Sequence, residues 1–144
     1  MAARTVISRL KGPLRWVLAL AMMSIGVAHF VRPEGFVRIV PAFLPAPLVL
    51  VYVSGFFEAL GGLGLLVPRV RRPAGYGLIA LYLAVFPANI NMAVNRIALD
   101  DAHPIPPALL WLRLPFQVLF IAWAWWVSSP DAPEAPDASR SGPA

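Results

Sequence analysis

The sequence alternates four long apolar stretches with short segments that are polar or rich in proline and glycine. Each stretch is 19 to 23 residues long, and about 20 residues are needed for a helix to cross the roughly 30 Å hydrocarbon core of a bilayer. A proline opens each stretch, in the first turn of a helix, where its missing N–H is not needed. The pattern predicts an all-α integral membrane four-helix bundle with spans at about 13–31, 45–67, 73–94 and 106–127.

One connection between the predicted spans is unusually long. Residues 32–44 exceed what a hairpin connection needs, and four apolar residues recur in them at helical spacing: Phe36, Ile39, Val40 and Phe43. We therefore predict a short amphipathic segment between the first and second spans, which lies in the outer membrane interface and covers the bundle.

The end of the chain differs in composition from the rest. Residues 128–144 are mainly proline, alanine, serine and acidic residues with no apolar period. Such a segment cannot bury enough apolar surface to fold, so it is predicted to be a disordered cytoplasmic tail. The remaining residues 1–127 are then a single transmembrane domain.

Composition narrows the class of protein further. The 144 residues are 59% hydrophobic and 13% charged, which is too little polar surface for a soluble domain. The basic residues flank apolar spans and form no single face, so a nucleic-acid partner is not expected and the partner is the lipid bilayer. The absence of cysteine excludes disulfides and thiolate metal sites within the chain.

The distribution of basic residues predicts the orientation in the membrane. Four lie before or at the start of the first span and three lie in the second connection, whereas the first and third connections contain Arg32, Arg38 and Arg96. Lysine and arginine favour the cytoplasmic side, so both termini are predicted to be cytoplasmic in an inner-membrane, multi-pass protein. The basic start also suits a cleavable signal peptide, but no small-x-small cleavage site follows and the run is long enough to span.

Polar and small residues fall on one face of each predicted span. Small residues allow helices to approach closely, and polar residues avoid lipid, so these four faces should meet at the bundle axis. No pair of ligands has metal-site spacing, so no metal site is predicted, and no catalytic residue can be assigned. The candidate ligand-binding cluster is His29, Ser54, Glu58, Asn89, Asn91, Arg113 and Gln117.

Glu58 and Arg113 are the charged members of this cluster. With a rise of about 1.5 Å per residue, Glu58 lies roughly 20 Å below the outer end of its span, and Arg113 lies roughly 10 Å below the start of its own. An unpaired charge in the bilayer costs at least about 2.5 kcal/mol. Either the two side chains pair, as a structural contact or within a ligand site, or Glu58 takes up a proton.

Five motifs in combination resemble the DoxX-like family of small bacterial membrane proteins. They are GVAHFVRP at 26–33, VPAFLP at 40–45, SGFFEALGGLGL at 54–65, VFPANINM at 85–92 and RLPFQ at 113–117. The resemblance covers about residues 14–127 and implies a four-helix membrane bundle associated with redox biology. Founding members of that family are similar to the membrane subunit of a thiosulfate:quinone oxidoreductase, and a related branch assists maturation of periplasmic dehydrogenases.

Three functions are compatible with these features. The first is a redox-associated membrane subunit that binds a quinone or similar lipophilic molecule, with no covalent cofactor, in an outer-half cavity. Phe30, Tyr52 and Phe86 would then form an apolar slot, with hydrogen-bonding side chains and a proton from the cluster described above. The second is a non-catalytic membrane anchor or assembly factor, and the third is a small proton-linked transporter. The expected protein partner is a redox enzyme subunit or a second copy of the chain, and enzymatic activity is left open.

Overall fold

The computed structural model describes residues 2–100 and 102–130, with side chains from Arg9 onward. All regular elements in this part of the chain are α-helices, and four of them are long and apolar enough to cross a membrane. This confirms the predicted all-α, four-helix, multi-pass membrane fold. The helices are α1 (Ala2–Val31), α2 (Pro33–Ile39), α3 (Pro47–Leu66), α4 (Arg71–Val94) and α5 (Pro107–Ser128).

Helix ends agree with the predicted spans to within two residues, except at the start of α1. That helix begins at Ala2, 11 residues before the predicted span, and contains Pro13 in its interior. The apolar pattern shows where a helix can enter hydrocarbon, but it does not show where its hydrogen bonding begins. The part of α1 that is apolar enough to span is Arg9–Val31.

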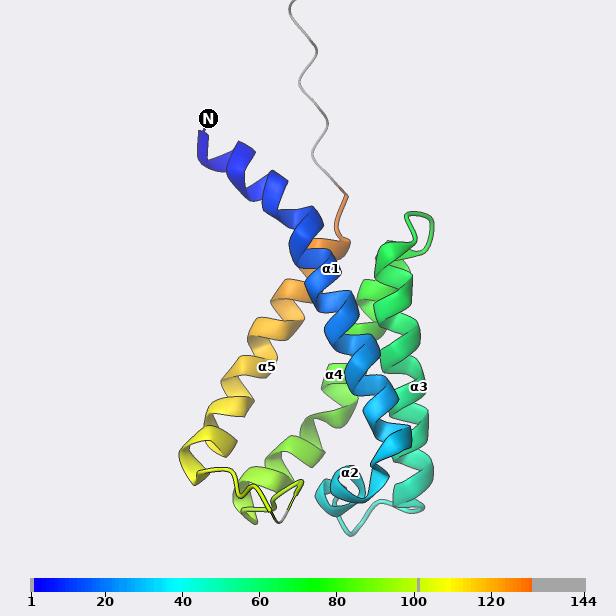
Figure 1. The fold of residues 1–144 in the computed structure, drawn as a ribbon, viewed down its shortest axis with the longest axis vertical. Helices are drawn as coiled ribbons and strands as arrows, with labels where there is room; N and C mark the ends of the chain where they lie inside the picture. The colour runs from blue at the N-terminus through cyan, green and yellow to red at the C-terminus, as the bar shows by residue number, and fades with distance from the viewer. Residues whose placement is uncertain (1, 101, 131–144) are drawn as a thin grey trace, which may run out of the picture.

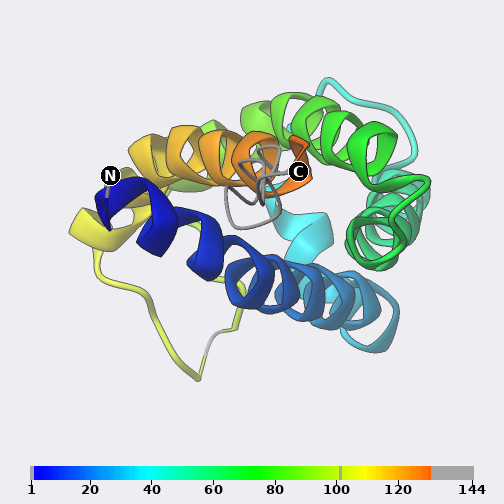
Figure 2. The same ribbon diagram turned by 90° about the horizontal axis from the view of Figure 1, so that it is seen from above.

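The four long helices form an open bundle. Neighbours along the series α1, α3, α4 and α5 pack against one another, whereas α1 and α5 meet near one end and diverge toward the other (Figure 1). We call the end that carries the short helix α2 the α2 end, and the opposite end the terminal end. Seen along the bundle, α2 lies within the outline of the long helices (Figure 2).

Glycines bring α1 and α3 into backbone contact. A Cβ atom on Gly26 would lie 2.6 Å from the carbonyl oxygen of Gly55 and 2.8 Å from the backbone nitrogen of Ala59. No side chain fits in that space, so the sequence must place glycine there for the helices to approach this closely. The contact lies directly beside His29 and Glu58, the polar pair described below.

Two basic side chains of α1 hold the end of α5. Nζ of Lys11 donates to the carbonyl oxygens of Ser129 and Pro130 at 2.7 and 3.0 Å, and Nε of Arg15 donates to that of Val127 at 2.8 Å. Carbonyls in the last turn of a helix lack helical partners and carry partial negative charge, so cations stabilise them.

This contact changes the predicted boundary of the tail. Ser128 is the last residue of α5 and is buried, so the predicted tail does not begin there. The composition of the segment is polar, but helix α5 and its carbonyl acceptors continue past the last apolar residue. The remainder of the predicted tail, 131–144, lies outside the described residues.

Buried apolar side chains form two separate clusters. The larger one fills the terminal half of the bundle: Leu18, Ala19, Met22, Leu65, Leu78, Tyr82, Ala124 and Val127. A smaller one at the α2 end joins α2, α4 and α5: Ile39, Met92, Ala93 and Leu110. The bundle is not filled continuously between them, because the helices diverge toward the α2 end while α2 covers that end.

Candidate ligand-binding cavity

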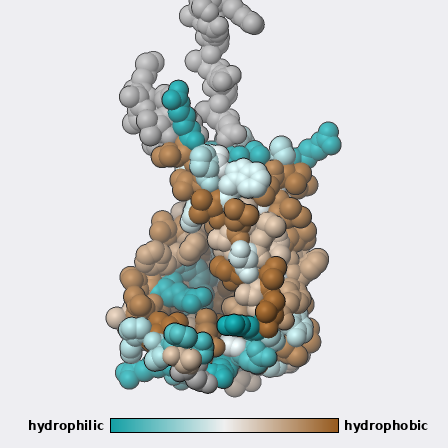
Figure 3. Space-filling view, in the orientation of Figure 1, coloured by the Kyte–Doolittle hydropathy of each residue, from teal (hydrophilic) through white to brown (hydrophobic). Residues whose placement is uncertain are grey.

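A cavity of about 460 Å³ lies on the α2 side of the larger apolar cluster. Its wall is mainly apolar and includes residues from all five helices. In Figure 3 a hollow with hydrophilic residues in its depth opens on the surface between α5 and α1. Its volume falls in the range of roughly 300–1,000 Å³ that is typical of small-molecule sites.

Six of the seven residues in the candidate cluster line this cavity: His29, Ser54, Glu58, Asn89, Arg113 and Gln117. Asn91 does not line it. Nδ2 of Asn91 donates to the carbonyl oxygen of Ile39 at 2.9 Å, and its Oδ1 accepts from Nδ2 of Asn95 at 2.7 Å. Asn91 therefore ties α2 to α4, because Ile39 is the last residue of α2 and its carbonyl has no helical donor.

His29 and Glu58 face each other across the contact between α1 and α3. Nδ1 of His29 lies 3.6 Å from Oε2 of Glu58 and donates to the carbonyl oxygen of Ile25 at 2.8 Å. The hydrogen on Nδ1 leaves Nε2 of the neutral ring as an acceptor. The His29 ring stacks on Phe36 of α2, with 3.8 Å between ring centroids. The hydrogen bond to Ile25 and the stack on Phe36 thus fix the imidazole ring next to the carboxyl group of Glu58.

Arg113 stands on the other side of the cavity and is exposed at its edge. A direct pair with Glu58, one of the two predicted alternatives, is not formed: among the described residues, the basic nitrogen within 4.0 Å of the Glu58 carboxyl group is Nδ1 of His29. Arg113 and Glu58 interact electrostatically across the cavity. Glu58 is 11 residues from the start of α3 and Arg113 is 6 residues from the start of α5. This difference in depth leaves space between the two side chains that a ligand group could fill.

Gln117 joins α4 and α5 beside the cavity. Its Oε1 accepts from Nδ2 of Asn89 at 2.6 Å, and its Nε2 donates to the backbone carbonyl of Tyr82. That carbonyl is five residues before Pro87 and precedes the carbonyl of Leu83, which loses its helical donor because proline has no N–H. The side-chain amides of Asn89 and Gln117 are therefore used in hydrogen bonds within the protein. Glu58, His29 and Arg113, in contrast, retain polar atoms toward the cavity.

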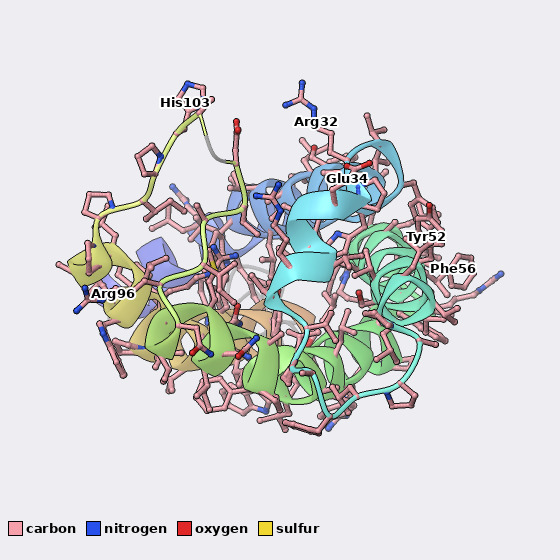
Figure 4. All side chains as sticks on the ribbon, turned by 90° about the horizontal axis from the view of Figure 1, so that it is seen from below. Arg32, Glu34, Tyr52, Phe56, Arg96 and His103 are labelled. Atoms are coloured by element: carbon pink, nitrogen blue, oxygen red, sulfur yellow. The ribbon has the colours of Figure 1, made fainter. Side chains whose placement is uncertain are left out.

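The prediction of the aromatic slot is wrong in its residues. Phe30 and Tyr52 stack on each other with 5.3 Å between ring centroids, and Tyr52 lies on the outer side of α3 (Figure 4). Neither residue lines the cavity, and Phe86 does not line it either. Phe30 follows His29 directly, and Tyr52 precedes Ser54 by two, so each is rotated away from the inward face of its helix.

The aromatic residues that do line the cavity are Phe36, Tyr82 and Phe120. Helical spacing could have identified two of them, because Tyr82 precedes Asn89 by two turns and Phe120 follows Gln117 by one. The hydroxyl of Tyr82 donates to Sδ of Met22 at 2.9 Å, which links α4 to α1 at the floor of the cavity. Sequence spacing does not place Phe36, because its position depends on how α2 folds back.

Helix α2 covers the end of the cavity. Ile39 is buried in the smaller apolar cluster, and a Cβ atom on Gly35 would collide with the carbonyl oxygen of Leu99, so α2 lies directly against the loop between α4 and α5. Figure 4 shows this end, with Arg32 and Glu34 near α2 and His103 on the loop. The predicted amphipathic face does not extend to Phe43, which is 79% exposed, because the helix ends at Ile39 before Pro41.

The donor set of the cavity suits an organic ligand. In the part of the chain that the structure describes, no three histidine, aspartate or glutamate side chains gather as a metal site would require. One carboxyl, one imidazole and one guanidinium instead surround an apolar space, which is a typical composition for a site that orients a largely apolar molecule through a few polar atoms.

Comparison with known proteins identifies a family for this chain. The model of a family described as a domain of unknown function (DUF8561) matches residues 18–128, which include every residue of the cavity. No curated protein and no solved structure matches the chain.

Proposed function

The chain belongs to the DUF8561 family, and we propose that it is a redox-associated subunit of a bacterial inner membrane that binds a quinone or similar lipophilic molecule. The observation that carries this proposal is the cavity of about 460 Å³ with Glu58, His29 and Arg113 in its wall. Ionisable residues at membrane depth are costly, so their gathering around an apolar space favours a functional site.

The depth and shape of the cavity suit a quinone head group. Glu58 is 11 residues from the start of α3, which places it roughly 16 Å into the helix and near the middle of the membrane. A quinone ring is flat and apolar, with a carbonyl oxygen at each of two opposite positions. Phe36, Tyr82 and Phe120 offer aromatic walls, and Arg113 is a hydrogen-bond donor on the side opposite Glu58 and His29.

Proton exchange is the chemical role that we assign to Glu58 and His29. Reduction of a quinone to a quinol consumes two electrons and two protons, and oxidation releases them. Carboxyl and imidazole groups are the usual proton donors and acceptors at such sites. In this proposal the electrons come from a partner redox subunit, in keeping with the resemblance to the DoxX-like family and with the absence of cysteine from the chain.

The orientation is part of the proposal. Both termini face the cytoplasm and the α2 end faces outward, supported by the seven basic residues at the N-terminal segment and second connection against three in the other connections. The cavity then lies in the outer half of the membrane, where a partner on the outer surface can reach the α2 end.

Purification from native membranes in mild detergent tests the proposal. Mass spectrometry of the purified protein should find a ratio of quinone to phospholipid higher than that of the bulk membrane, together with a redox enzyme subunit.

The variant Arg113→Leu should reduce the quinone enrichment. The lipid-facing change Leu119→Ala serves as a matched control on α5, because Leu119 is 57% exposed and does not line the cavity. A quinone content equal to that of bulk lipid would contradict the proposal. Co-purification of proteins alone would favour an anchor or assembly factor, and a second copy would indicate a homo-oligomer.

A further inference from the structure

The exposed parts of the cavity wall lie on the sides of the bundle. Of the residues that line the cavity, five are exposed, and all belong to membrane-spanning helices: Ile25, Leu50, Val53, Ala84 and Arg113. Ile25 belongs to α1 and Arg113 to α5, the two helices between which the hollow in Figure 3 opens, whereas the other three belong to α3 and α4. In a membrane these edges contact lipid, so the cavity communicates with the bilayer.

The α2 end of the same wall is covered. The lining residues contributed by α2 and the turn after it are all buried or half-buried: Phe36, Ile39, Val40, Pro41 and Leu44. Three independent contacts hold this cover in place: the stack of Phe36 on His29, the hydrogen bond from Asn91 to Ile39, and the packing of Gly35 on Leu99. Water at that end is therefore separated from the cavity by a helix that is fixed to α1, α4 and the α4–α5 loop.

We infer that the cavity is entered from within the bilayer, through the gap between α1 and α5, and that its ligand is a membrane-resident amphiphile whose hydrocarbon tail stays in that gap. The naming of a quinone as the head group rests on the proposed function, whereas the route does not. A molecule that is confined to the membrane needs no aqueous entrance, and the closed α2 end provides none.

The gap between α1 and α5 is favoured over the side between α3 and α4 by charge and by shape. Arg113 lies at the edge of the first gap, so a polar head group that enters there meets a guanidinium on its way to Glu58 and His29. The exposed edges on α3 and α4 are the apolar residues Leu50, Val53 and Ala84. The hollow with hydrophilic residues in its depth is seen between α5 and α1 (Figure 3).

A first experiment tests the route without any ligand. The chain has no cysteine, so a single nitroxide label can be attached at Ser54→Cys in the cavity, with Leu112→Cys as a lipid-facing control and Arg96→Cys as a control on the loop at the α2 end. Power-saturation EPR in lipid nanodiscs then measures contact with oxygen, which partitions into lipid, and with a water-soluble nickel chelate. We expect the cavity label to behave like the Leu112 label. Nickel contact equal to that of the Arg96 label would overturn the inference.

A second experiment tests where the tail lies. Binding of a ubiquinone with a long isoprenoid tail is compared with binding of the same benzoquinone head without a tail, in wild type, Ile25→Trp, Val53→Trp and the α1 control Leu20→Trp. The larger side chain in Ile25→Trp should fill the gap. It should weaken binding of the long-tailed quinone by about tenfold or more and binding of the tailless head by less than about twofold. An equal effect on both compounds, or a selective loss in Val53→Trp instead, would overturn the assignment of the gap. Failure of both compounds to bind wild type would contradict the proposed quinone function, and the EPR result would still decide the route.

Discussion

Nδ1 of His29 lies 3.6 Å from Oε2 of Glu58, at the place where Gly26 and Gly55 bring the backbones of α1 and α3 into contact. The polar pair and the glycine contact are parts of one arrangement, because a larger residue at either glycine would separate the helices that carry His29 and Glu58. Close packing of small residues therefore positions a carboxyl group in the cavity wall.

Replacing Gly26 by alanine should destabilise the bundle. The new methyl group would lie 2.6 Å from the carbonyl oxygen of Gly55, which is backbone and cannot move independently. Overpacking of this kind costs about 1–3 kcal/mol, measured as a lower free energy of unfolding in detergent. A Cβ atom on Gly77 of α4 would have no atom within 4 Å, so Gly77→Ala should be neutral or stabilising by up to about 1 kcal/mol. Equal destabilisation by both changes would show that the α1–α3 contact is not close.

A double-mutant cycle should couple Glu58 to His29 more strongly than to Arg113. His29→Phe retains a ring against Phe36 while removing the nitrogens, and Glu58→Gln removes the carboxyl charge. We expect a coupling of about 1 kcal/mol for this pair, because its atoms are nearly in contact. For Glu58→Gln with Arg113→Gln the coupling should be below about 0.5 kcal/mol, since the two side chains are separated by the cavity. The reverse order would mean that Glu58 pairs with Arg113 in the membrane.

Truncation at two positions should show how much the end of α5 contributes to stability, apart from the segment that follows it. A chain that ends at Pro130 retains the carbonyl acceptors of Lys11 and the buried Ser128, whereas a chain that ends at Val127 loses them. Loss of two hydrogen bonds to a charged donor costs about 1.5–3 kcal/mol for each bond, less where water replaces the acceptor. Thermal unfolding in detergent should therefore show a lower midpoint for the chain that ends at Val127. Identical midpoints would show that the contact contributes nothing to stability.

The sequence predicted the membrane spans and most of the polar cavity, but not the contacts within the cavity. Spans follow from hydropathy and length alone, and inward faces follow from helical spacing, so six of the seven candidate residues are found around one cavity. Which polar residues touch depends on helix rotation and on the depth at which each helix begins. A shift of a few residues in the depth of one helix is enough to change whether the Glu58 carboxyl group contacts His29, as it does here, or Arg113.

Other parts could not be derived because they depend on tertiary packing. The role of Asn91 as a partner of α2 required knowledge of where α2 folds, and the same holds for the stack of Phe36 on His29. In the sequence, Lys11 and Arg15 indicate only the orientation, and the structure adds their hydrogen bonds to the end of α5. Basic residues near a membrane interface can serve both purposes, and composition does not distinguish them.

The orientation in the membrane can be tested with reporter fusions. Fusions of alkaline phosphatase and of green fluorescent protein at Ala144 and within the loop between Asp100 and His103 should give opposite signals, because the two positions lie on opposite sides of the membrane in our proposal. We expect fluorescence and no phosphatase activity at Ala144, and phosphatase activity in the loop. Phosphatase activity at Ala144 would refute the proposed topology.

The most direct test of the proposed function is quinone binding to the purified protein in nanodiscs, measured by quenching of tryptophan fluorescence or by calorimetry. Wild type should bind a long-tailed ubiquinone or menaquinone saturably at one site per chain. Glu58→Leu and Arg113→Leu should each weaken binding by about tenfold or more, because each removes a polar partner of the head group, while Leu119→Ala should bind as wild type does. Absence of saturable binding, or affinities for the two cavity variants equal to that of wild type, would contradict the account.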